Sequence, residues 1–153
     1  MADYFLKLDG IPGESRDSKH KDEIELVSFS WGLTQSGATG GGGSRAQFKN
    51  LESLMRVSKA SPQLFLACAS GTHIKEATLS VRRAAKATLE YLKIKFTDVL
   101  VTSYAQAGDE EVPHETVAFD FARIELEYTP QQAGGAAAGA IKAGWDLKQN
   151  LKI

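Results

Sequence analysis

The sequence predicts a mainly β domain, a compact antiparallel β-barrel or sandwich with one short helix. Short runs of alternating apolar and polar residues recur along the chain, which is the pattern of half-buried strands. Three of these runs change the face that carries their apolar residues, as strands do in strongly curved sheets that close on themselves. Only residues 61–70 have the character of a clear helix. These elements favour sheet packed on sheet, with the helix at one side.

Length and composition indicate a single domain, residues 1–153, which at this size typically buries about 70% of the surface of its unfolded chain. The single cysteine, Cys68, cannot form an internal disulfide, and no Cys/His cluster has the spacing of a zinc site. Eighteen basic and nineteen acidic residues leave a net charge of -1. The overall field therefore favours neither nucleic acid nor an anionic membrane as a partner.

The N-terminus lacks a charged segment followed by an uninterrupted apolar one, and the chain contains no run of about 18 apolar residues. We therefore expect no membrane insertion and a soluble chain made in the cytoplasm. If the protein leaves the cell, we expect it to do so without a cleaved signal peptide.

The first two predicted strands are residues 3–8 and 24–31, separated by a charged loop. In the second strand the apolar residues move from even to odd positions, from Ile24 and Leu26 to Val27, Phe29 and Trp31. Because side chains alternate sides with period two, this shift requires a β-bulge or a change of the buried face. A strand with apolar groups on both sides is expected to have something packed against each side.

A flexible loop is predicted at residues 37–44, because five glycines in eight positions leave high backbone entropy and few side chains to pack.

The helix is predicted to begin at Ser61-Pro62, where serine can cap an amide and proline suits the first helical position. Gly71 is the predicted stop. The helix is apolar nearly all round, which indicates a short element, including Cys68, that covers a hydrophobic opening.

Strand patterns return from Ala77, with a predicted turn at residues 86–88 and a second run through Leu92, Ile94 and Phe96. The apolar positions then change parity at Val99 and Val101. They change again in the run from 117 to 128, near Ala122-Arg123. Residues 108–113 are predicted to form an acidic loop, 131–144 a loop of small residues, and 145–148 a last strand.

The residue pattern predicts no catalytic residue, cofactor or metal ligand. The three histidines, His20, His73 and His114, are each predicted to be exposed loop residues. Ser15, Asp17 and His20 could in principle pair as nucleophile and base, but no nucleophile elbow surrounds them. The glycine run is not a phosphate cradle either, because no Gly-Lys-Ser/Thr follows it and Rossmann spacing is absent.

Arg82, Arg83 and Lys86 form a small basic cluster near a predicted turn. A solvated strand end is the simpler interpretation of this cluster. The alternative is a surface that forms salt bridges with acidic residues on another copy of the chain, such as Asp109, Glu110 and Glu111.

Two tryptophans and two serines are further candidates for contact surfaces. Trp31 and Trp145 are predicted to anchor the core or an interface, because large aromatic side chains contribute most where they are desolvated. Ser28 and Ser30 alternate with apolar neighbours, which predicts a solvated strand face. A concave face of this kind could also line a lumen and hold unfolded cargo.

An ordered set of motifs through nearly the whole chain resembles the haemolysin-coregulated protein (Hcp) family of bacterial type VI secretion systems. The motifs are Phe5-Leu6-Lys7-Leu8, Gly13-Glu14-Ser15 followed by Asp17 and His20, Ser28-Phe29-Ser30-Trp31-Gly32, Ser61-Pro62, Ala67-Cys68-Ala69-Ser70-Gly71, Glu90-Tyr91-Leu92, and Gly144-Trp145-Asp146 with Asn150. Each motif alone is weak, whereas their order is specific.

The resemblance implies a closed antiparallel barrel of two curved sheets with one flanking helix, and no enzymatic activity. It implies six copies in a ring and stacked rings that form the inner tube of a contractile injection machine. Its partners would be a VgrG-type spike, the contractile sheath and small effector proteins held in the lumen. The protein would be cytoplasmic before firing and secreted afterwards, as a bare tube subunit without an effector domain.

Ring and stacking contacts are expected at the glycine loop, at the acidic loop of residues 109–113 and at the basic pair Arg82 and Arg83. The central glycines of the first loop are Gly40, Gly41, Gly42 and Gly43. Two other classes of function remain open from the residues alone. One is a monomeric barrel that binds a small apolar ligand, and the other is a hydrolase that uses Ser15 and His20.

Overall fold

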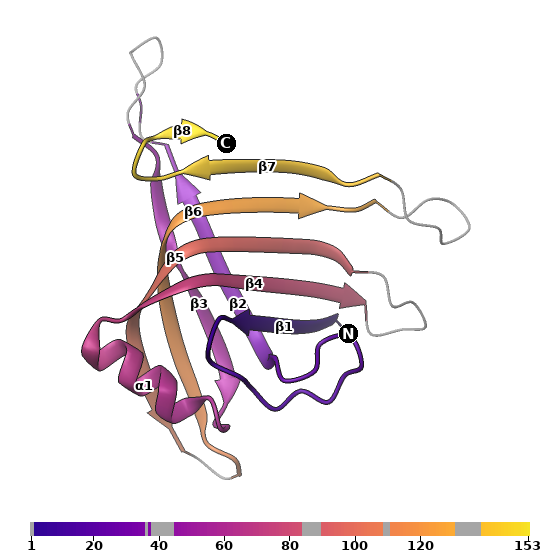
Figure 1. Cartoon of the computed structure of the whole chain (residues 1–153), viewed down its shortest axis with the longest axis vertical. Coiled ribbons are helices and arrows are strands. Elements are labelled where there is room, and N and C mark those ends of the chain that lie inside the picture. The colour runs from indigo at the N-terminus through magenta and orange to yellow at the C-terminus, as the bar shows by residue number, and fades with distance from the viewer. Residues whose placement is uncertain (1, 36, 38–44, 84–89, 109–110, 131–138) are drawn as a thin grey trace.

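The computed structural model describes residues 2–35, 37, 45–83, 90–108, 111–130 and 139–153. Figure 1 shows the arrangement of the helix and the strands. The elements are β1 (Ala2–Leu8), β2 (Ile24–Thr34), β3 (Gln47–Arg56), α1 (Ser61–Ser70), β4 (His73–Arg83), β5 (Glu90–Ala107), β6 (His114–Tyr128), β7 (Ile141–Asp146) and β8 (Leu151–Lys152). The predicted mainly β fold with one helix is confirmed.

The strands form one antiparallel sheet that closes on itself. Neighbouring strands follow the order β3-β2-β1-β4-β5-β6-β7-β8, and an additional pairing joins β3 to β6 from Leu51↔Phe119 to Arg56↔His114. The second half of β6, from Arg123 to Tyr128, pairs instead with β7. In Figure 1, β4 to β7 therefore run side by side while β2 and β3 cross them. The closed antiparallel barrel that the sequence predicted is confirmed.

The predicted change of buried face occurs at one position that β5 and β6 share. Thr97↔Arg123 and Val99↔Phe121 are partners, so Asp98 lies opposite Ala122. Asp98 has a φ of 55°, in the left-handed region, which reverses the alternation of side chains along β5. The inward residues consequently change from even to odd positions in β5 and from odd to even in β6.

The predicted irregularity of β2 is also confirmed, because its register with β3 shifts between Leu26 and Ser28 and again between Ser30 and Gly32. Its pairing with β1 extends only from Ile24 to Leu26. Beyond that point Phe29 and Trp31 are partly buried, whereas Val27 is 44% exposed. The apolar groups on the two sides of β2 are therefore not covered to the same extent.

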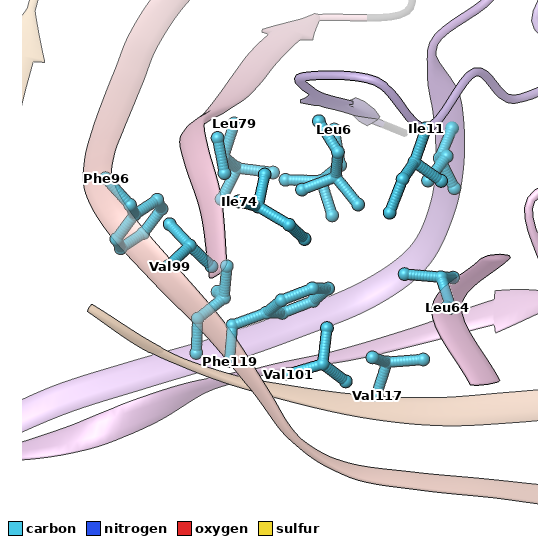
Figure 2. Packing of buried hydrophobic residues seen from close by; sticks show 14 of the residues in the cluster. Leu6, Ile11, Leu64, Ile74, Leu79, Phe96, Val99, Val101, Val117 and Phe119 are labelled. Carbon is cyan, nitrogen blue, oxygen red and sulfur yellow. The ribbon is translucent and has the colours of Figure 1, made fainter. Parts of the chain in front are cut away.

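Closely packed side chains fill the interior of the barrel. Phe96 and Phe119 are the largest fully buried ones, and Figure 2 shows them with apolar residues from β1, β4 and β5. Leu64 enters the same cluster from α1. Burying an aliphatic or aromatic side chain of this size contributes about 1.5–3 kcal/mol, so the core is the main source of stability.

The helix ends as predicted but begins differently. Gly71, with a φ of 69°, donates its N–H to the carbonyl oxygen of Ala67 (3.0 Å) and stops α1. The prediction that Ser61 caps the first turn is wrong: Ala60 is the cap residue and makes no side-chain cap hydrogen bond. Ser61 instead donates its hydroxyl to Glu115 Oε1 (2.9 Å), because this serine is buried beside that carboxylate.

Only one face of α1 covers the barrel. Leu64 and Ala67 are buried and Cys68 is half-buried, whereas Phe65 and Leu66 are 59% and 62% exposed. The helix therefore covers the opening as expected but leaves two large apolar side chains in solvent. No helix among the described residues is long and apolar enough to cross a membrane.

Three strands, β3, β7 and β8, were not predicted where they occur. β3 received no assignment from the sequence, because its inward positions include the polar Ser53, whose hydroxyl donates to the carbonyl oxygen of Val117 (3.0 Å). The predicted loop 131–144 overlaps β7, which begins at Ile141, and the predicted last strand 145–148 runs into a turn at 147–150. The predicted loop at 37–44, apart from Gly37, and the predicted turn at 86–88 lie outside the described residues.

A pair of phenylalanine variants tests this account of the core. Phe119→Ala removes a fully buried ring and should lower the free energy of unfolding by about 3–5 kcal/mol. Phe65→Ala removes an exposed ring and should change it by about 1 kcal/mol or less. Urea denaturation at a single low protein concentration measures both values. Equal losses from the two variants would contradict the assigned core.

Candidate functional site

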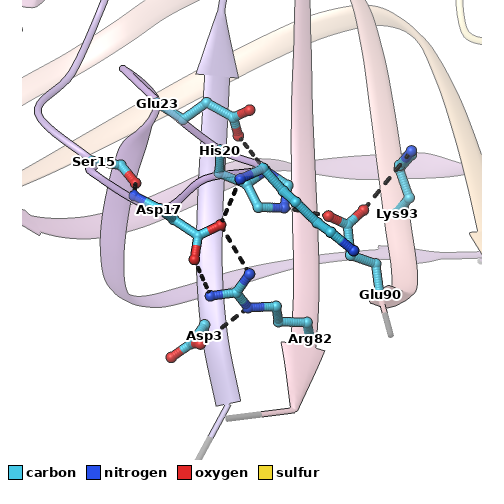
Figure 3. A network of polar contacts seen from close by, with 9 residues as sticks. Asp3, Ser15, Asp17, His20, Glu23, Arg82, Glu90 and Lys93 are labelled. Carbon is cyan, nitrogen blue, oxygen red and sulfur yellow. Dashed lines mark hydrogen bonds and ion pairs between the residues drawn. The ribbon is translucent and has the colours of Figure 1, made fainter. Parts of the chain in front are cut away.

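The residues of the suggested hydrolase site lie in a polar cluster beside β1 (Figure 3). His20 is only 5% exposed, stacks on the ring of Phe5 with 4.3 Å between centroids, and places Nδ1 3.0 Å from Glu23 Oε1. Its Nε2 contacts Glu90 of β5. The prediction that His20 is an exposed loop residue is therefore wrong, because two carboxylates satisfy both ring nitrogens in a buried position.

The other two histidines differ from each other. The side chain of His73 is exposed, as predicted, and its Nδ1 lies 2.7 Å from Asp98 Oδ1. His114 is half-buried at the start of β6, so the prediction of an exposed loop residue is wrong there as well. Its place on a strand that pairs with both β3 and β5 explains this burial.

Arg82 binds two carboxylates of the polar cluster, those of Asp17 and Asp3. Its Nη1 donates to Asp17 Oδ2 (2.9 Å), its Nε donates to Asp3 Oδ2 (3.2 Å), and the guanidinium lies 4.9 Å from the centroid of the Phe5 ring. The hydrogen bonds from Arg82 lower the pKa of Asp17 from 3.8 to about 2, and the same pairing raises the pKa of Arg82. One guanidinium on β4 thus connects β1 with the loop between β1 and β2.

The simpler interpretation of the basic cluster, a solvated strand end, is wrong for Arg82 and stays a prediction for Arg83. The Arg82 side chain is 15% exposed and its carboxylate partners belong to its own chain. Arg83 is exposed near the ring of Tyr91. A contact of either arginine with another copy stays a prediction, and Lys86 lies outside the described residues.

This cluster does not have the geometry of a hydrolase. Ser15 is buried, and its Oγ accepts a hydrogen bond from the Asp17 N–H (3.2 Å). Both nitrogens of His20 face carboxylates, so no histidine acts on the Ser15 hydroxyl. Among the described residues no group of three or more metal-binding side chains occurs. The cluster fastens the loop to the barrel.

A second buried polar group was not found from the sequence. Glu115 is 1% exposed, and it accepts hydrogen bonds from the hydroxyls of Ser61 and Tyr104. The pKa of Tyr104 is raised mainly by the burial of its hydroxyl and, to a smaller extent, by the hydrogen bond to Glu115. The sequence did contain a signal for this burial. Glu115 lies at an odd position, as the apolar residues Val117 and Phe119 of the same strand do, and therefore points inward with them.

The two predicted tryptophan anchors meet in an apolar groove where the end of β2 and the start of β3 approach β6, β7 and the following turn. We call this the tryptophan groove, and its volume is about 520 Å³. Its lining residues are Trp31, Leu33, Gln35, Ala46, Phe48, Ile124, Leu126, Ala143, Gly144, Trp145 and Asn150. Both tryptophans are half-buried and pack against the core.

Gly144 has no room for a larger residue in this groove. A Cβ atom there would lie 2.9 Å from Ile153 Cγ1, 3.1 Å from Glu125 Cγ and 3.2 Å from the carbonyl oxygen of Ile124. The glycine therefore lets the C-terminal segment lie closely over β7.

The remaining predicted contact residues can be placed only in part. Ser28 and Ser30 are exposed on β2, opposite Leu54 and Glu52 of β3. Their role in a lumen stays a prediction. Glu111 is exposed, whereas Gly40, Gly41, Gly42, Gly43, Asp109 and Glu110 lie outside the described residues.

Comparison with known proteins gives a consistent result over the whole chain. A family model described as "Type VI secretion system effector, Hcp" matches residues 5–128. Protein hcp1 of Pseudomonas aeruginosa is 37% identical over 159 residues, which cover 99% of this chain and 98% of that protein. The crystal structure of Hcp1 from Salmonella typhimurium is similar with a TM-score of 0.85 and 39% identity over 100% of both chains. The crystal structure of a type VI secretion system effector from Yersinia pestis gives 0.79 and 36% identity, covering 94% of this chain and 99% of that one.

The pairing of Asp17 with Arg82 predicts a specific pH dependence. The lowered pKa of Asp17 in the folded state means that its ionised form stabilises the fold above about pH 4, and that this contribution is lost as the pH falls toward 2. We expect the difference in free energy of unfolding between the wild type and Arg82→Gln to be largest near pH 6 and to shrink between about pH 4 and pH 2. Urea titrations across this range measure it.

The exposed neighbour provides the control for this experiment. Arg83→Gln should leave the pH dependence of unfolding as in the wild type, because its guanidinium has no carboxylate partner among the described residues. A difference between wild type and Arg82→Gln that stays constant from about pH 6 to pH 2 would contradict the role of Asp17.

Proposed function

Because the chain belongs to the Hcp family of type VI secretion system proteins, we propose that it is the structural subunit of the inner tube of such a system. Six copies form a ring, rings stack into a tube, and the tube is exported with a lumen that can hold and chaperone effector proteins. The observation that carries the proposal is the 37% identity to hcp1 over 99% of this chain and 98% of that protein.

The outer surface supports assembly with other copies. Five large apolar side chains are about half exposed or more: Leu33, Phe65, Leu66, Val112 and Ile141. Exposed apolar side chains that adjoin one another, as the consecutive residues Phe65 and Leu66 of α1 do in sequence, are typical of surfaces that contact a partner. The net charge of -1 limits repulsion between identical copies. A ring needs a heterologous interface, in which one surface meets a different surface of the next copy.

The same proposal assigns the protein no enzymatic role. Ser15 and His20 are the residues that a hydrolase would use, and the contacts of both are taken up by backbone and carboxylate groups. The partners are then other proteins: a VgrG-type spike, the contractile sheath and small effectors. The subunit resides in the cytoplasm before firing and outside the cell afterwards.

The alternative of a monomeric barrel with a ligand inside receives less support. Phe96, Phe119 and the other fully buried side chains occupy the interior that such a ligand would need. The tryptophan groove is apolar and of ligand size, but it is open to solvent and is not an enclosed cavity of the interior. A monomer in solution is the outcome that this alternative requires.

Particle mass and shape test the proposal directly. Light scattering coupled to size exclusion should give six times 16.5 kDa, about 99 kDa. Negative-stain images of the same fraction should show rings with an open centre. A mass of 16.5 kDa at every concentration, with no annular particles, would contradict the tube subunit.

The glycine loop gives a second test, which separates assembly from folding. Deletion of Gly40 to Gly43 should reduce the stacking of rings, while the midpoint of thermal unfolding shifts by only a few degrees. Replacement of the same four glycines by serines keeps the loop length and is the matched control. Stacks as long as those of the wild type after the deletion would remove the loop from the contact.

A further inference from the structure

We propose that residues 9–23, which connect β1 to β2, form a strap whose tip is fastened to β5 by a proton on His20. When both ring nitrogens of His20 carry a proton, the tip binds Glu90 and covers the ring of Phe5. When His20 is neutral, the tip leaves β5 and Phe5 becomes exposed. This inference goes beyond the proposed function, because it concerns a single subunit and holds whether or not copies assemble.

The strap covers an apolar residue on the outer side of the barrel. Leu6 belongs to the interior cluster, and Phe5 points the other way because side chains alternate along a strand. The strand partners of Phe5, Glu25 and Ser80, share this outer side. Phe5 is nevertheless only 3% exposed, and the ring of His20 stacks on it with 4.3 Å between centroids. The strap therefore buries an aromatic ring that the barrel interior does not contain.

The base of the strap is folded on itself. Gly13 donates its N–H to the carbonyl oxygen of Asp22 (2.7 Å), and Ser15 donates its N–H to that of Glu23 (3.0 Å). A Cβ atom at Gly13 would lie 2.5 Å from the Glu23 carbonyl oxygen, so only glycine allows the two segments to approach this closely. The tip, residues 16–21, extends from this base to β4 and β5. Release of the tip therefore leaves the base intact.

Two side chains fasten the tip, and pH acts on them differently (Figure 3). The hydrogen bond from Arg82 of β4 lowers the pKa of Asp17 to about 2, so this ion pair persists in mild acid and at neutral pH. His20 contacts Glu90 through Nε2 and Glu23 of the strap through Nδ1 (3.0 Å). Histidine is the side chain whose charge ordinarily changes between about pH 5 and pH 8. Of the two fasteners, only His20 can respond to pH in this range.

The two contacts of His20 require a cationic ring. An ionised carboxylate only accepts hydrogen bonds, whereas a neutral imidazole has one N–H donor and one bare nitrogen. A neutral His20 would therefore point a lone pair at either Glu23 or Glu90. The side chains of the three residues are 6%, 13% and 21% exposed, so water replaces a lost hydrogen bond poorly. Loss of one proton consequently breaks one of the two contacts.

The contact with β5 is the one that a neutral ring gives up. Glu23 is three residues from His20 in the same strap and stays within reach wherever the tip lies. Glu90 has a second partner, because Lys93 Nζ lies 3.9 Å from its Oε2. The neutral ring can therefore donate from Nδ1 to Glu23, while repulsion between the bare Nε2 and Glu90 moves the tip away from β5.

The charges around the ring favour a cation at this position. The less exposed charged groups are Asp3 of β1, Arg82 of β4, Glu90 of β5, and Asp17 and Glu23 of the strap. Four carboxylates thus surround one guanidinium, and a proton on His20 reduces this excess of negative charge. The exposed charged groups, which water and salt screen, are Lys7, Glu14, Arg16, Lys19, Lys21, Asp22, Glu25 and Lys93.

A thiol placed on the covered side reports whether the strap is closed. In a Cys68→Ser background, Ser80→Cys puts a small thiol at a position that is 4% exposed and lies opposite Phe5. Its rate of reaction with N-ethylmaleimide measures how often the strap opens. Nitrogen-15 NMR of the same protein shows which ring nitrogens of His20 carry a proton from about pH 5 to pH 8.

Glu90→Gln is the matched variant, because it keeps the size of the side chain and removes the need for a cation. The amide accepts from an N–H of His20 or donates to its bare nitrogen, so the strap should stay closed in both states of the ring. Comparison of the two chains at each pH cancels the titration of the thiol. The reaction rate without Glu90→Gln, divided by the rate with it, should rise by about tenfold or more as His20 becomes neutral, the effect of losing one charge-assisted hydrogen bond.

The controls decide between the possible outcomes. His73→Gln changes an exposed histidine and should leave the pH dependence of this ratio as it was. A ratio that stays constant while His20 loses a proton would overturn the latch, as would the same pH dependence in His20→Gln. A ring with an unchanged number of protons across the whole range would overturn it too. Light scattering at each pH records the state of assembly, so the latch and the proposed function can fail separately.

Discussion

The reversal of side-chain alternation at Asp98 and Ala122 is the constraint on which the barrel depends. It allows β5 to present Phe96 inward before Asp98 and Val99 inward after it. In β6, Phe119 points inward before Ala122 and Ile124 after it. Aspartate tolerates the left-handed backbone better than most residues. Its carboxylate also accepts hydrogen bonds from His73 (2.7 Å) and Lys148 (3.2 Å), which lower the pKa of Asp98 and fix the bend against β4 and the turn after β7.

A barrel that is filled in this way leaves its outer surface for function. The described polar side chains that are buried have hydrogen-bond partners, and the His20 and Arg82 cluster is used to fasten a loop. Two apolar surfaces are left incompletely buried: the exposed side chains of Phe65 and Leu66 on α1, and the tryptophan groove. On the proposed function, burial of apolar surface between copies would supply the affinity of assembly.

Features that depend on the apolar periodicity of a segment could be predicted from the sequence. Features that depend on polar contacts between distant segments could not. The changes of parity in β2, β5 and β6, the helix and its stop at Gly71 were all readable, because each depends on neighbours in the chain. The burial of His20 depends on Glu90, 70 residues away, and no local pattern signals such a partner. The groove likewise combines Trp31 with Trp145, so both anchors were predicted while the hollow between them was not.

Closure of the barrel by β3 and β6 has a consequence during protein synthesis. Ser53 and Val117 are hydrogen-bonded partners although 64 residues separate them. At typical translation rates of about 5–20 residues per second, the ribosome needs roughly 3–13 s to make the intervening segment. Throughout this interval the nascent chain carries a β3 edge with no strand to pair with. An unpaired edge of this kind can pair with other chains, so slower elongation lengthens the time for which the unclosed sheet is exposed to aggregation.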